Sequence, residues 1–164
     1  STRMVEHAAS RFEADYVTLP APLYVINQVV HDLLPEEPAL EHCLKVANRM
    51  DLLFCGIGTL SSVDSIPAWH QAKDQIFPGV DPADVAGMLF GRPYDIHGHF
   101  LIPERDTTVG IPLEDVMATP RRFGVIKSKF KTYAALGALR GKLLTDLVMD
   151  EGIAQRILTA KDEV

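Results

Sequence analysis

The sequence predicts an α/β fold in which a mainly parallel sheet is flanked by helices. Short apolar and β-branched runs alternate along the chain with longer stretches of helical periodicity, and this alternation is typical of parallel strands joined by helices. The 164 residues are 47% hydrophobic and 23% charged, which is the composition of one ordinary globular domain. A chain of this size buries a core without a disulfide or a metal. We therefore expect a single α/β sandwich.

The first part of the chain has the pattern of a helix, a strand and a second helix. Apolar residues recur at helical spacing over residues 1–14, and residues 15–19 have the pattern of a strand that Pro20 ends. Residues 36–49 form the next predicted helix, because prolines stand at its start and apolar residues follow at helical spacing. The chain begins without Met and without a cap before its first helical turn, so we expect it to be truncated at the N-terminus.

The strongest strand pattern lies at residues 51–55, which we expect to be a buried, central strand. This strand leads into a loop of glycine and hydroxyl residues at 56–62, and a helix is predicted over residues 66–77 with Pro67 in its first turn. Open α/β sheets bind their ligands at the carboxyl ends of strands. The loop is therefore the first candidate for a binding site.

The second half of the chain continues the alternation after a short excursion. Residues 85–95, 99–102 and 108–111 have the pattern of short strands joined by glycine turns, which predicts a hairpin outside the main sheet. The remaining elements are predicted in the order helix, strand, helix, strand and helix, at residues 113–117, 123–126, 129–140, 144–149 and 151–158.

Charge is distributed unevenly along the chain. Residues 1–120 carry a net charge of −10 and residues 121–164 carry +4, which together give the formal charge of −6. The stretch from Arg121 to Lys142 contains seven Lys or Arg residues and no Asp or Glu. Such a stretch suits a small anion or a negatively charged partner, and it equally fits a solvated helix face. The acidic remainder, without a helix-turn-helix pattern, argues against duplex DNA binding by this chain.

Several classes of site are disfavoured by the sequence. Cys43 and Cys55 form no CxxC pair and no secretory leader is present, which indicates buried thiols in a reducing cytoplasm. His97 and His99 flank a glycine, but no HExxH motif or cysteine pair supports a metal site there. Every apolar run is shorter than about 18 residues, so no membrane span is expected. We also predict no cofactor, because a P-loop and a dinucleotide fingerprint are both missing.

The loop Gly56-Ile57-Gly58-Thr59 has a chemical interpretation and a structural one. Its glycines let the backbone come close to a ligand, and free N–H groups with the Thr59 hydroxyl can donate to phosphate or sugar oxygens. The alternative is a plain turn that binds nothing.

Charged residues stand at the starts of two predicted helices. Lys131 can bind a phosphate as a point charge, or its lysine neighbours can lower its pKa toward carbonyl addition, or it is simply an exposed lysine. Asp150 and Glu151 begin the last helix, where capping competes with binding a sugar hydroxyl.

Five short motifs follow one another over nearly the whole chain. They are Leu19-Pro20-Ala21-Pro22-Leu23-Tyr24-Val25, Asp51-Leu52-Leu53-Phe54-Cys55-Gly56-Ile57-Gly58, Gly91-Arg92-Pro93-Tyr94-Asp95-Ile96-His97-Gly98, Lys131 with Ala134-Ala135-Leu136-Gly137-Ala138-Leu139-Arg140-Gly141, and Asp150-Glu151 with Ala154. In this order they resemble the carboxyl-terminal sugar-binding domain of the SorC family of bacterial transcriptional regulators. The specificity of the resemblance lies in the ordered set.

The resemblance implies a Rossmann-like three-layer sandwich related to sugar-phosphate isomerases. It implies a cytoplasmic effector domain that binds a phosphorylated sugar, forms homodimers or homotetramers, and controls operator DNA only through an N-terminal helix-turn-helix domain that this chain lacks. Lys131 takes the family's lysine position and would reach the charged or carbonyl end of the effector. The full set of residues that we expect to line or adjoin the effector site is Gly56, Ile57, Gly58, Thr59, Arg92, Asp95, Lys131, Asp150 and Glu151.

The chain departs from the family pattern at three places. Lys127-Ser128 replaces the usual Gly-Gly, Met88 follows Gly87 where the family usually has an acidic residue, and Met149 replaces a Thr. Because a lost glycine prevents the same close approach of backbone, either the added lysine charge holds the ligand or the pocket has changed.

Two alternative functions remain open from the sequence. A sugar-phosphate isomerase or deaminase of the same fold would use Asp95 or Asp150 as a general base, although no carboxylate and histidine pair stands at a recognisable spacing. A pure oligomerisation module with a decayed pocket would account for the missing glycines.

Overall fold

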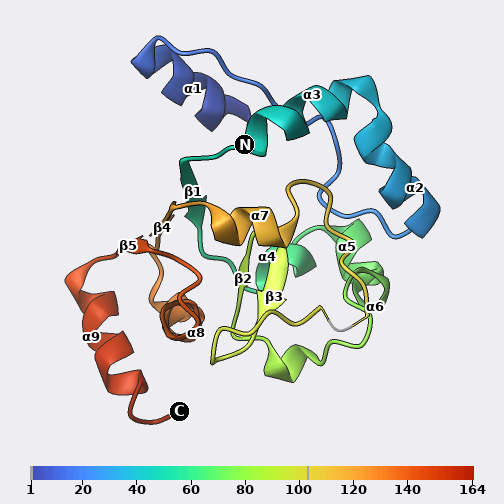
Figure 1. Cartoon of the computed structure of the whole chain (residues 1–164). Helices are drawn as coiled ribbons and strands as arrows, with labels where there is room; N and C mark the ends of the chain where they lie inside the picture. Colours follow the sequence, from blue (N-terminus) through green and yellow to red (C-terminus); the bar gives the residue numbers. More distant parts are fainter. Residues whose placement is uncertain (1, 103) are drawn as a thin grey trace.

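A parallel sheet of three strands lies at the centre of the molecule. The computed structural model describes residues 2–102 and 104–164, and within them β1 (Leu52–Gly56), β4 (Arg121–Val125) and β5 (Asp146–Val148) pair in the order β1-β4-β5 (Figure 1). Both pairings are parallel, with Phe54 opposite Phe123 and Phe123 opposite Asp146. The predicted α/β class and the three strands of this sheet are therefore confirmed.

Strand β1 differs from the prediction in its place and its burial. It lies at the edge of the described sheet, where β4 is the central strand. Its side chains alternate between exposed and half-buried, so the prediction of a buried central strand is wrong. The exposure of the β1 side chains alternates because Leu53 and Cys55 face the core, whereas Leu52 and Phe54 point to the opposite side of the sheet. On that side both side chains are exposed to solvent.

We call the bare side of the sheet the outer face, and it carries several apolar side chains beside the Arg121–Asp146 ion pair. Phe54 and Phe123 stack there with ring centroids 5.7 Å apart. Leu52 and Val148 are also exposed, and by strand alternation they belong to the same face. The outer face therefore presents apolar side chains from all three strands.

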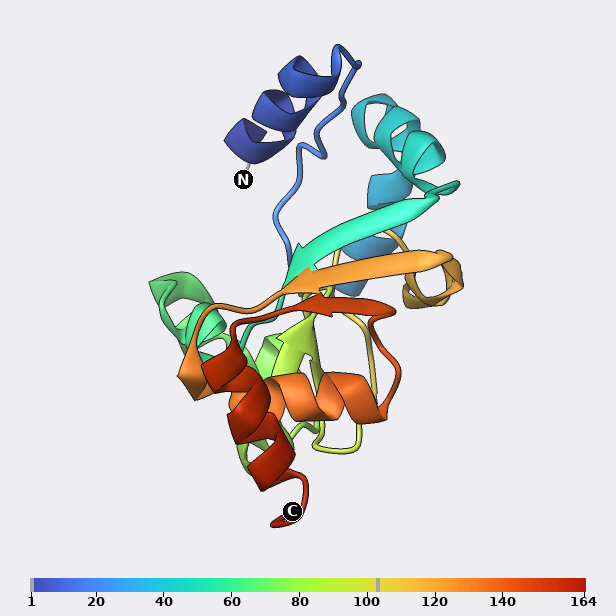
Figure 2. The same cartoon turned by 90° about the vertical axis from the view of Figure 1, so that its left-hand side faces the viewer.

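Helices α8 (Thr132–Arg140) and α9 (Glu151–Ala160) cover the inner face of the sheet (Figure 2). The main core forms around α8, where Ala134, Ala135 and Ala138 pack with residues such as Ile57 and Tyr94. Small side chains allow this central position, because a Cβ on Gly137 would lie 2.7 Å from the Asp95 carbonyl oxygen. The helices predicted over 129–140 and 151–158 are confirmed, the first beginning as a 3₁₀ turn, η3 (Lys129–Lys131).

A two-stranded hairpin packs against α8 and contributes to the same core. Its strands β2 (Gly87–Leu89) and β3 (Arg92–Tyr94) are antiparallel. The turn between them uses positive φ values of 57° at Phe90 and 76° at Gly91, which matches the right-handed twist of the strands. A hairpin was predicted in this region, but between other segments: residues 85–95 were expected to be one strand, and they contain both β2 and β3. Residues 99–102 and 108–111 form only isolated bridges, from Phe100 to Tyr94 and from Thr108 to Tyr24.

The N-terminal region is helical, as its periodicity predicts, but its predicted strand is absent. Helix α1 (Thr2–Phe12) is confirmed, and α3 (Pro38–Ala47) forms most of the helix predicted over 36–49. Residues 15–19 pair with no other strand among the described residues, because a β-branched run becomes a strand only where a neighbour supplies hydrogen bonds. Figure 2 shows α1 and α3 beyond β1, at the end of the sheet away from α8.

Several short helices complete the chain. Asn27 caps an unpredicted helix, α2 (Gln28–Leu33), through a bond from the Val30 N–H to its side chain, and the 3₁₀ turn η1 (Leu34–Glu36) follows. The helix predicted over 66–77 is interrupted at Ala72. The other short elements are α4 (Ser61–Asp64), α5 (Pro67–Gln71), α6 (Lys73–Ile76), η2 (Pro82–Asp84) and α7 (Leu113–Ala118), the last of these being predicted.

Candidate functional site

The loops that follow the three parallel strands meet at one end of the sheet. Residues 57–59 follow β1, residues 126–128 follow β4 and residues 149–151 follow β5. In a parallel sheet these carboxyl ends lie side by side, and the amino ends of the following helices point toward them. This end of the sheet is therefore the candidate binding site.

Lys131 and the glycine loop are in direct contact. The Lys131 Nζ donates a hydrogen bond to the Ile57 carbonyl oxygen at 2.6 Å. Gly58 exchanges two backbone bonds with Met88, at 3.0 and 2.9 Å, which fix the loop against the hairpin. The Thr59 and Ser61 hydroxyls lie 2.6 Å apart. The structure thus brings together the loop Gly56–Thr59 and Lys131, two features that the sequence analysis selected separately.

A cap at Ser128 positions the lysine. The Ser128 hydroxyl accepts a bond from the Phe130 N–H at 3.3 Å and begins η3. The Thr132 hydroxyl donates to the Lys129 carbonyl oxygen at 2.7 Å and holds the other end of this turn. Sequence reasoning regarded Ser128 only as a lost glycine. Its signal as a cap is that of a hydroxyl residue immediately before a helical segment.

Met88 lies directly against the candidate site. A Cβ on Gly58 would stand 3.5 Å from the Met88 Cβ, and the Met88 side chain is buried in a second apolar cluster with Tyr24, Ile76 and Phe77. Met88 therefore holds the glycine loop through its backbone, while its side chain fills this apolar cluster.

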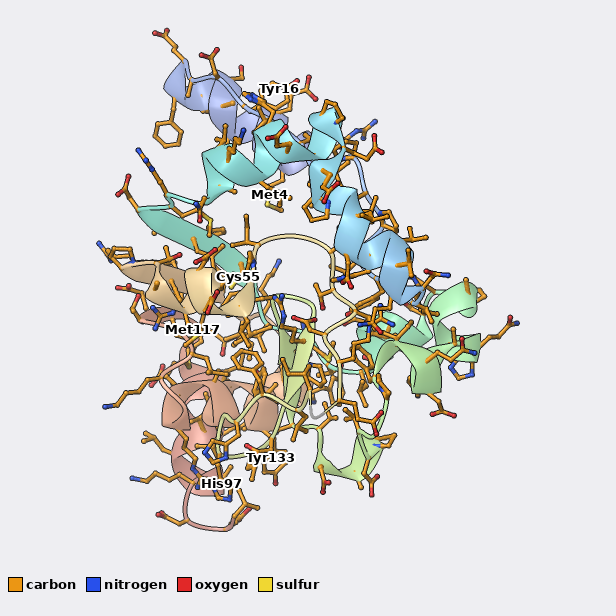
Figure 3. The ribbon with its side chains drawn as sticks, turned by 45° about the vertical axis from the view of Figure 1, so that its right-hand side comes forward. Met4, Tyr16, Cys55, His97, Met117 and Tyr133 are labelled. Carbon is orange, nitrogen blue, oxygen red and sulfur yellow. The ribbon has the colours of Figure 1, made fainter. Side chains whose placement is uncertain are left out.

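Asp95 belongs to a tight turn beside α8. Its carboxylate accepts the backbone N–H groups of His97 and His99, both at 2.9 Å. Burial raises the pKa of Asp95, but these two N–H groups and the His99 side chain more than offset it, so the pKa lies below its usual range. Asp95 and His97 line an open cleft of about 600 Å³ together with Phe130 and Tyr133. Figure 3 shows His97 and Tyr133 at the same end of the molecule.

Arg92 lies inside the protein and its guanidinium is occupied. It is 3% exposed, and it donates to the Asp106 carboxylate at 2.7 Å and to the carbonyl oxygens of Phe90 and Ile111 at 3.0 and 3.2 Å. Burial raises the pKa of Asp106, but the hydrogen bonds that it accepts and the charge of Arg92 lower this pKa by more. The net result is a pKa below the usual range. In this arrangement Arg92 anchors the hairpin to the segment that follows it.

Asp150 and Glu151 both act within α9. The Asp150 side chain accepts the Ile153 N–H at 2.9 Å and caps the helix. Glu151 is exposed and accepts a bond from the Gln155 amide at 3.3 Å. The sequence left two roles open for Asp150, capping the helix and binding a sugar hydroxyl. The structure gives a contact for capping.

The remaining candidate features are a metal centre, a reactive thiol and a membrane span. Among the described residues no group of three or more His, Cys, Asp or Glu side chains could hold a metal ion. Burial raises the pKa of the Cys55 thiol to about 11, so it is a poor nucleophile at neutral pH. Within 2–102 and 104–164 no helix is both long and apolar enough to cross a bilayer.

Comparison with known proteins gives the family of the chain. The family model described as "Putative sugar-binding domain" matches residues 1–159 of the 164. The chain belongs to this family of sugar-binding domains. It is similar to the transcriptional regulator LsrR of Escherichia coli K12, with 27% identity over 146 residues that cover 85% of this chain and 45% of LsrR.

Solved structures show the same fold. The full-length sorbitol operon regulator SorC from Klebsiella pneumoniae matches 93% of this chain and 50% of its own, with a TM-score of 0.79 and 21% identity. A domain of a possible sugar-binding transcriptional regulator from Arthrobacter aurescens matches 96% of this chain and 62% of its own, with a TM-score of 0.77 and 22% identity.

These relatives confirm the resemblance to SorC-type regulators that the five motifs indicated. They are regulators and not isomerases, so they favour the effector-domain interpretation over the enzyme. The sugar-binding domain spans about half the length of the curated relatives that it matches, since it covers 45% of LsrR.

Proposed function

We propose that this domain binds a phosphorylated sugar as the effector of a bacterial transcriptional regulator in the cytoplasm, without turning it over. Operator DNA would be bound by a helix-turn-helix domain outside residues 1–164, and these residues would form a single, partial effector domain. The observation that carries the proposal is the contact of Lys131 with the Ile57 carbonyl oxygen at the carboxyl ends of the strands. It places a cation beside a glycine loop in a chain of the sugar-binding family.

The phosphate group would bind beside Lys131. An ammonium that already donates to one backbone oxygen has further N–H donors for a phosphate oxygen. Lys127 and Lys129 stand on either side of the Ser128 cap and add positive charge to the same turn. Backbone N–H groups and hydroxyls of Gly56–Thr59 and Ser61 would bind the remaining oxygens. No metal or cofactor is required for such binding.

The carboxylates would hold structure or bind hydroxyl groups, and they suit catalysis poorly. A general base works best with a pKa near the operating pH. The pKa of Asp95 is held below its usual range by its N–H donors, and Asp150 is occupied as a helix cap. These contacts support an effector site over an isomerase. Arg92, Asp150 and Glu151 would then act through the fold, with Asp95 at the margin of the site.

The test is a thermal-shift comparison of sugar phosphates with their unphosphorylated parents. A ligand at about 100 times its Kd stabilises the native state by about 2.7 kcal/mol, so a true effector raises the Tm measurably. We expect stabilisation by phosphorylated members alone. Equal shifts with the parents would contradict the phosphate assignment, and no shift with any member would favour a pocket that has decayed.

Lys131→Ala sharpens this test. Because a hydrogen bond to a charged group contributes about 1.5 to 3 kcal/mol, we expect at least a 10-fold loss of affinity for the phosphorylated ligand in isothermal titration. Lys45→Ala is the matched control, since Lys45 lies on α3 and pairs with Glu41. An unchanged affinity in Lys131→Ala would remove Lys131 from the site.

A further inference from the structure

Two separate apolar clusters meet beside the candidate site. One is the main core around α8, and we call the other the Tyr24 cluster. The buried members of the Tyr24 cluster are Tyr24, Val63, Ile76, Phe77 and Met88. Trp69, the single tryptophan of the chain, packs against it, edge-on to Tyr24 with ring centroids 5.0 Å apart. Phe77 meets Tyr24 in the same way at 5.4 Å, so Tyr24 is the centre of this cluster.

The glycine loop and β2 lie on the boundary between the two clusters. Ile57 and Leu89 belong to the main core, whereas Met88 belongs to the Tyr24 cluster. The pair of backbone bonds between Gly58 and Met88 joins the two segments at this boundary. The Lys131 Nζ binds the Ile57 carbonyl oxygen, one residue before this pair. A ligand beside Lys131 would thus lie next to the junction of the clusters.

A second connection begins at the hydroxyl residues of the loop. Thr59 and Ser61, whose hydroxyls lie 2.6 Å apart, lead directly into α4. Val63 on α4 is 3% exposed and is part of the Tyr24 cluster. A phosphate that accepts bonds from Lys131 and from these hydroxyls would join the start of α8 to the start of α4. Such a ligand would restrain the two clusters relative to each other.

The Tyr24 cluster also anchors a peripheral segment, residues 23–33, which we call the strap. It contains α2, which lies at the periphery of the molecule in Figure 1. All residues of the strap are described by the structure, and Tyr24 alone among them is buried. The exposed apolar side chains of α2 are Val29, Val30 and Leu33. A segment with so few buried contacts opens at a low free energy.

Hydrogen bonds attach the strap to a segment that is itself fixed to the Tyr24 cluster. The Val25 N–H donates to the Thr107 carbonyl oxygen at 2.9 Å, and the Val109 N–H donates to the Leu23 carbonyl oxygen at 2.8 Å. The Thr107 hydroxyl in turn donates to the Ile76 carbonyl oxygen at 2.8 Å. The strap and its partner segment therefore share one anchor, and the packing of the Tyr24 cluster decides how often the strap opens.

We propose that occupancy of the effector site closes the strap. A phosphorylated ligand at Lys131 and the loop hydroxyls tightens the Tyr24 cluster and lowers the fraction of molecules in which residues 23–33 are detached. This inference rests on the proposed effector function and adds a conformational output to it. A ligand that binds the closed state better shifts the population toward that state. The apolar side chains of α2 are then presented in a fixed arrangement when the site is occupied.

Hydrogen exchange of the whole chain, followed by mass spectrometry, tests the inference. The probe is inorganic phosphate at saturating concentration, and sodium chloride at equal ionic strength is the reference. We expect phosphate to slow the exchange of residues 25–33 by about 5-fold or more, as is usual for coupling between two sites. Helix α1 is the internal control, since it lies outside the Tyr24 cluster. Acrylamide quenching of Trp69 fluorescence should fall in parallel, because Trp69 packs against Tyr24.

A substitution outside the site tests the reverse direction of the coupling. Coupling between two sites is reciprocal, so loosening the Tyr24 cluster must weaken the binding of phosphate. We expect Phe77→Leu to raise the Kd for phosphate by about 5-fold in isothermal titration. Leu40→Ala is the matched control, because Leu40 is also buried but belongs to neither cluster. This control should keep the wild-type Kd.

The outcomes separate the strap from the effector function. Phosphate binding that Lys131→Ala abolishes, with strap exchange and Trp69 quenching unchanged by phosphate, would overturn the strap inference and leave the effector function standing. Absence of any phosphate binding would overturn both the phosphate position beside Lys131 and the strap inference. Equal losses of affinity in Phe77→Leu and Leu40→Ala would indicate a general loss of stability, which would overturn the coupling.

Discussion

Helices α1 and α8 were both predicted from periodicity, yet the fold uses them in opposite ways. Six of the nine residues of α8 are buried, and its core-facing positions are Ala, Gly, Leu and Thr. In α1 the buried residue is Ala9, while Met4, Val5 and Phe12 are exposed. The comparison teaches that an apolar stripe predicts a helix but not how much of it is buried. Small side chains allow α8 to be enclosed by the sheet, the hairpin and α9.

The largest expected contrast comes from enlarging a small residue in each helix. Ala135 is 0% exposed, so Ala135→Leu adds three heavy atoms to a filled space and should lower the free energy of unfolding by about 3 kcal/mol. Ala8→Leu makes the same change on the exposed side of α1 and should alter it by less than about 0.5 kcal/mol. Urea unfolding of both variants checks the pair. Equal losses would mean that α1 is packed as tightly as α8.

A smaller effect concerns the hairpin against which α8 packs. Asp106→Asn weakens the acceptor of the buried Arg92 guanidinium and should cost about 2 kcal/mol at neutral pH. The pKa of Asp106 is depressed in the folded state, so its contribution is present above the unfolded pKa and is lost as the pH falls through the folded value.

Chemical unfolding from neutral pH into the acid range measures this contribution. The free energy of unfolding of the wild type should fall as the pH drops below about 4, the ordinary pKa of Asp. In Asp106→Asn this fall should be smaller, because the variant has no carboxylate to protonate at this position. Glu6→Gln on α1 removes a charge from an exposed helix and serves as the matched control. An unchanged acid profile in Asp106→Asn would show that the Arg92 pair does not anchor the hairpin.

The smallest effect is expected on α1 itself. Phe12→Ser exchanges an 82% exposed aromatic ring for a hydroxyl and should change the free energy of unfolding by less than about 0.5 kcal/mol. Phe77→Ser makes the same exchange at a buried residue and should cost about 3 kcal/mol or more. Thermal unfolding of the two variants gives the comparison. A large loss in Phe12→Ser would place Phe12 in a core.

Much of the fold follows from local patterns, and the errors have a common physical cause. The three parallel strands, α1, α8 and α9 were all predicted, because periodicity acts over short distances. A hairpin was also expected between residues 85 and 111, but its two strands both lie within 85–95, which was predicted as one strand. Residues 15–19 and the burial of β1 were predicted wrongly. A strand depends on which segments lie beside and above it, and those neighbours are distant in sequence.

The candidate site shows the same division between what is local and what is not. The sequence selected Lys131 and the glycine loop, and the structure joins them through one hydrogen bond. It also selected Arg92, which the fold surrounds with Asp106 and two carbonyl oxygens. The sequence motif alone does not show whether an arginine binds a ligand or a carboxylate of its own chain. Only the position of Asp106, fourteen residues later, separates the two roles.

The edge position of β1 has a practical consequence for handling the protein. Among the described residues β1 pairs with β4 on one side alone, and its outer face carries Leu52 and Phe54. A free strand edge next to an apolar surface is a template for strand addition between molecules. In a sample that contains residues 1–164 alone, Phe54→Lys would place a charge beside this edge and should slow strand-rich aggregation.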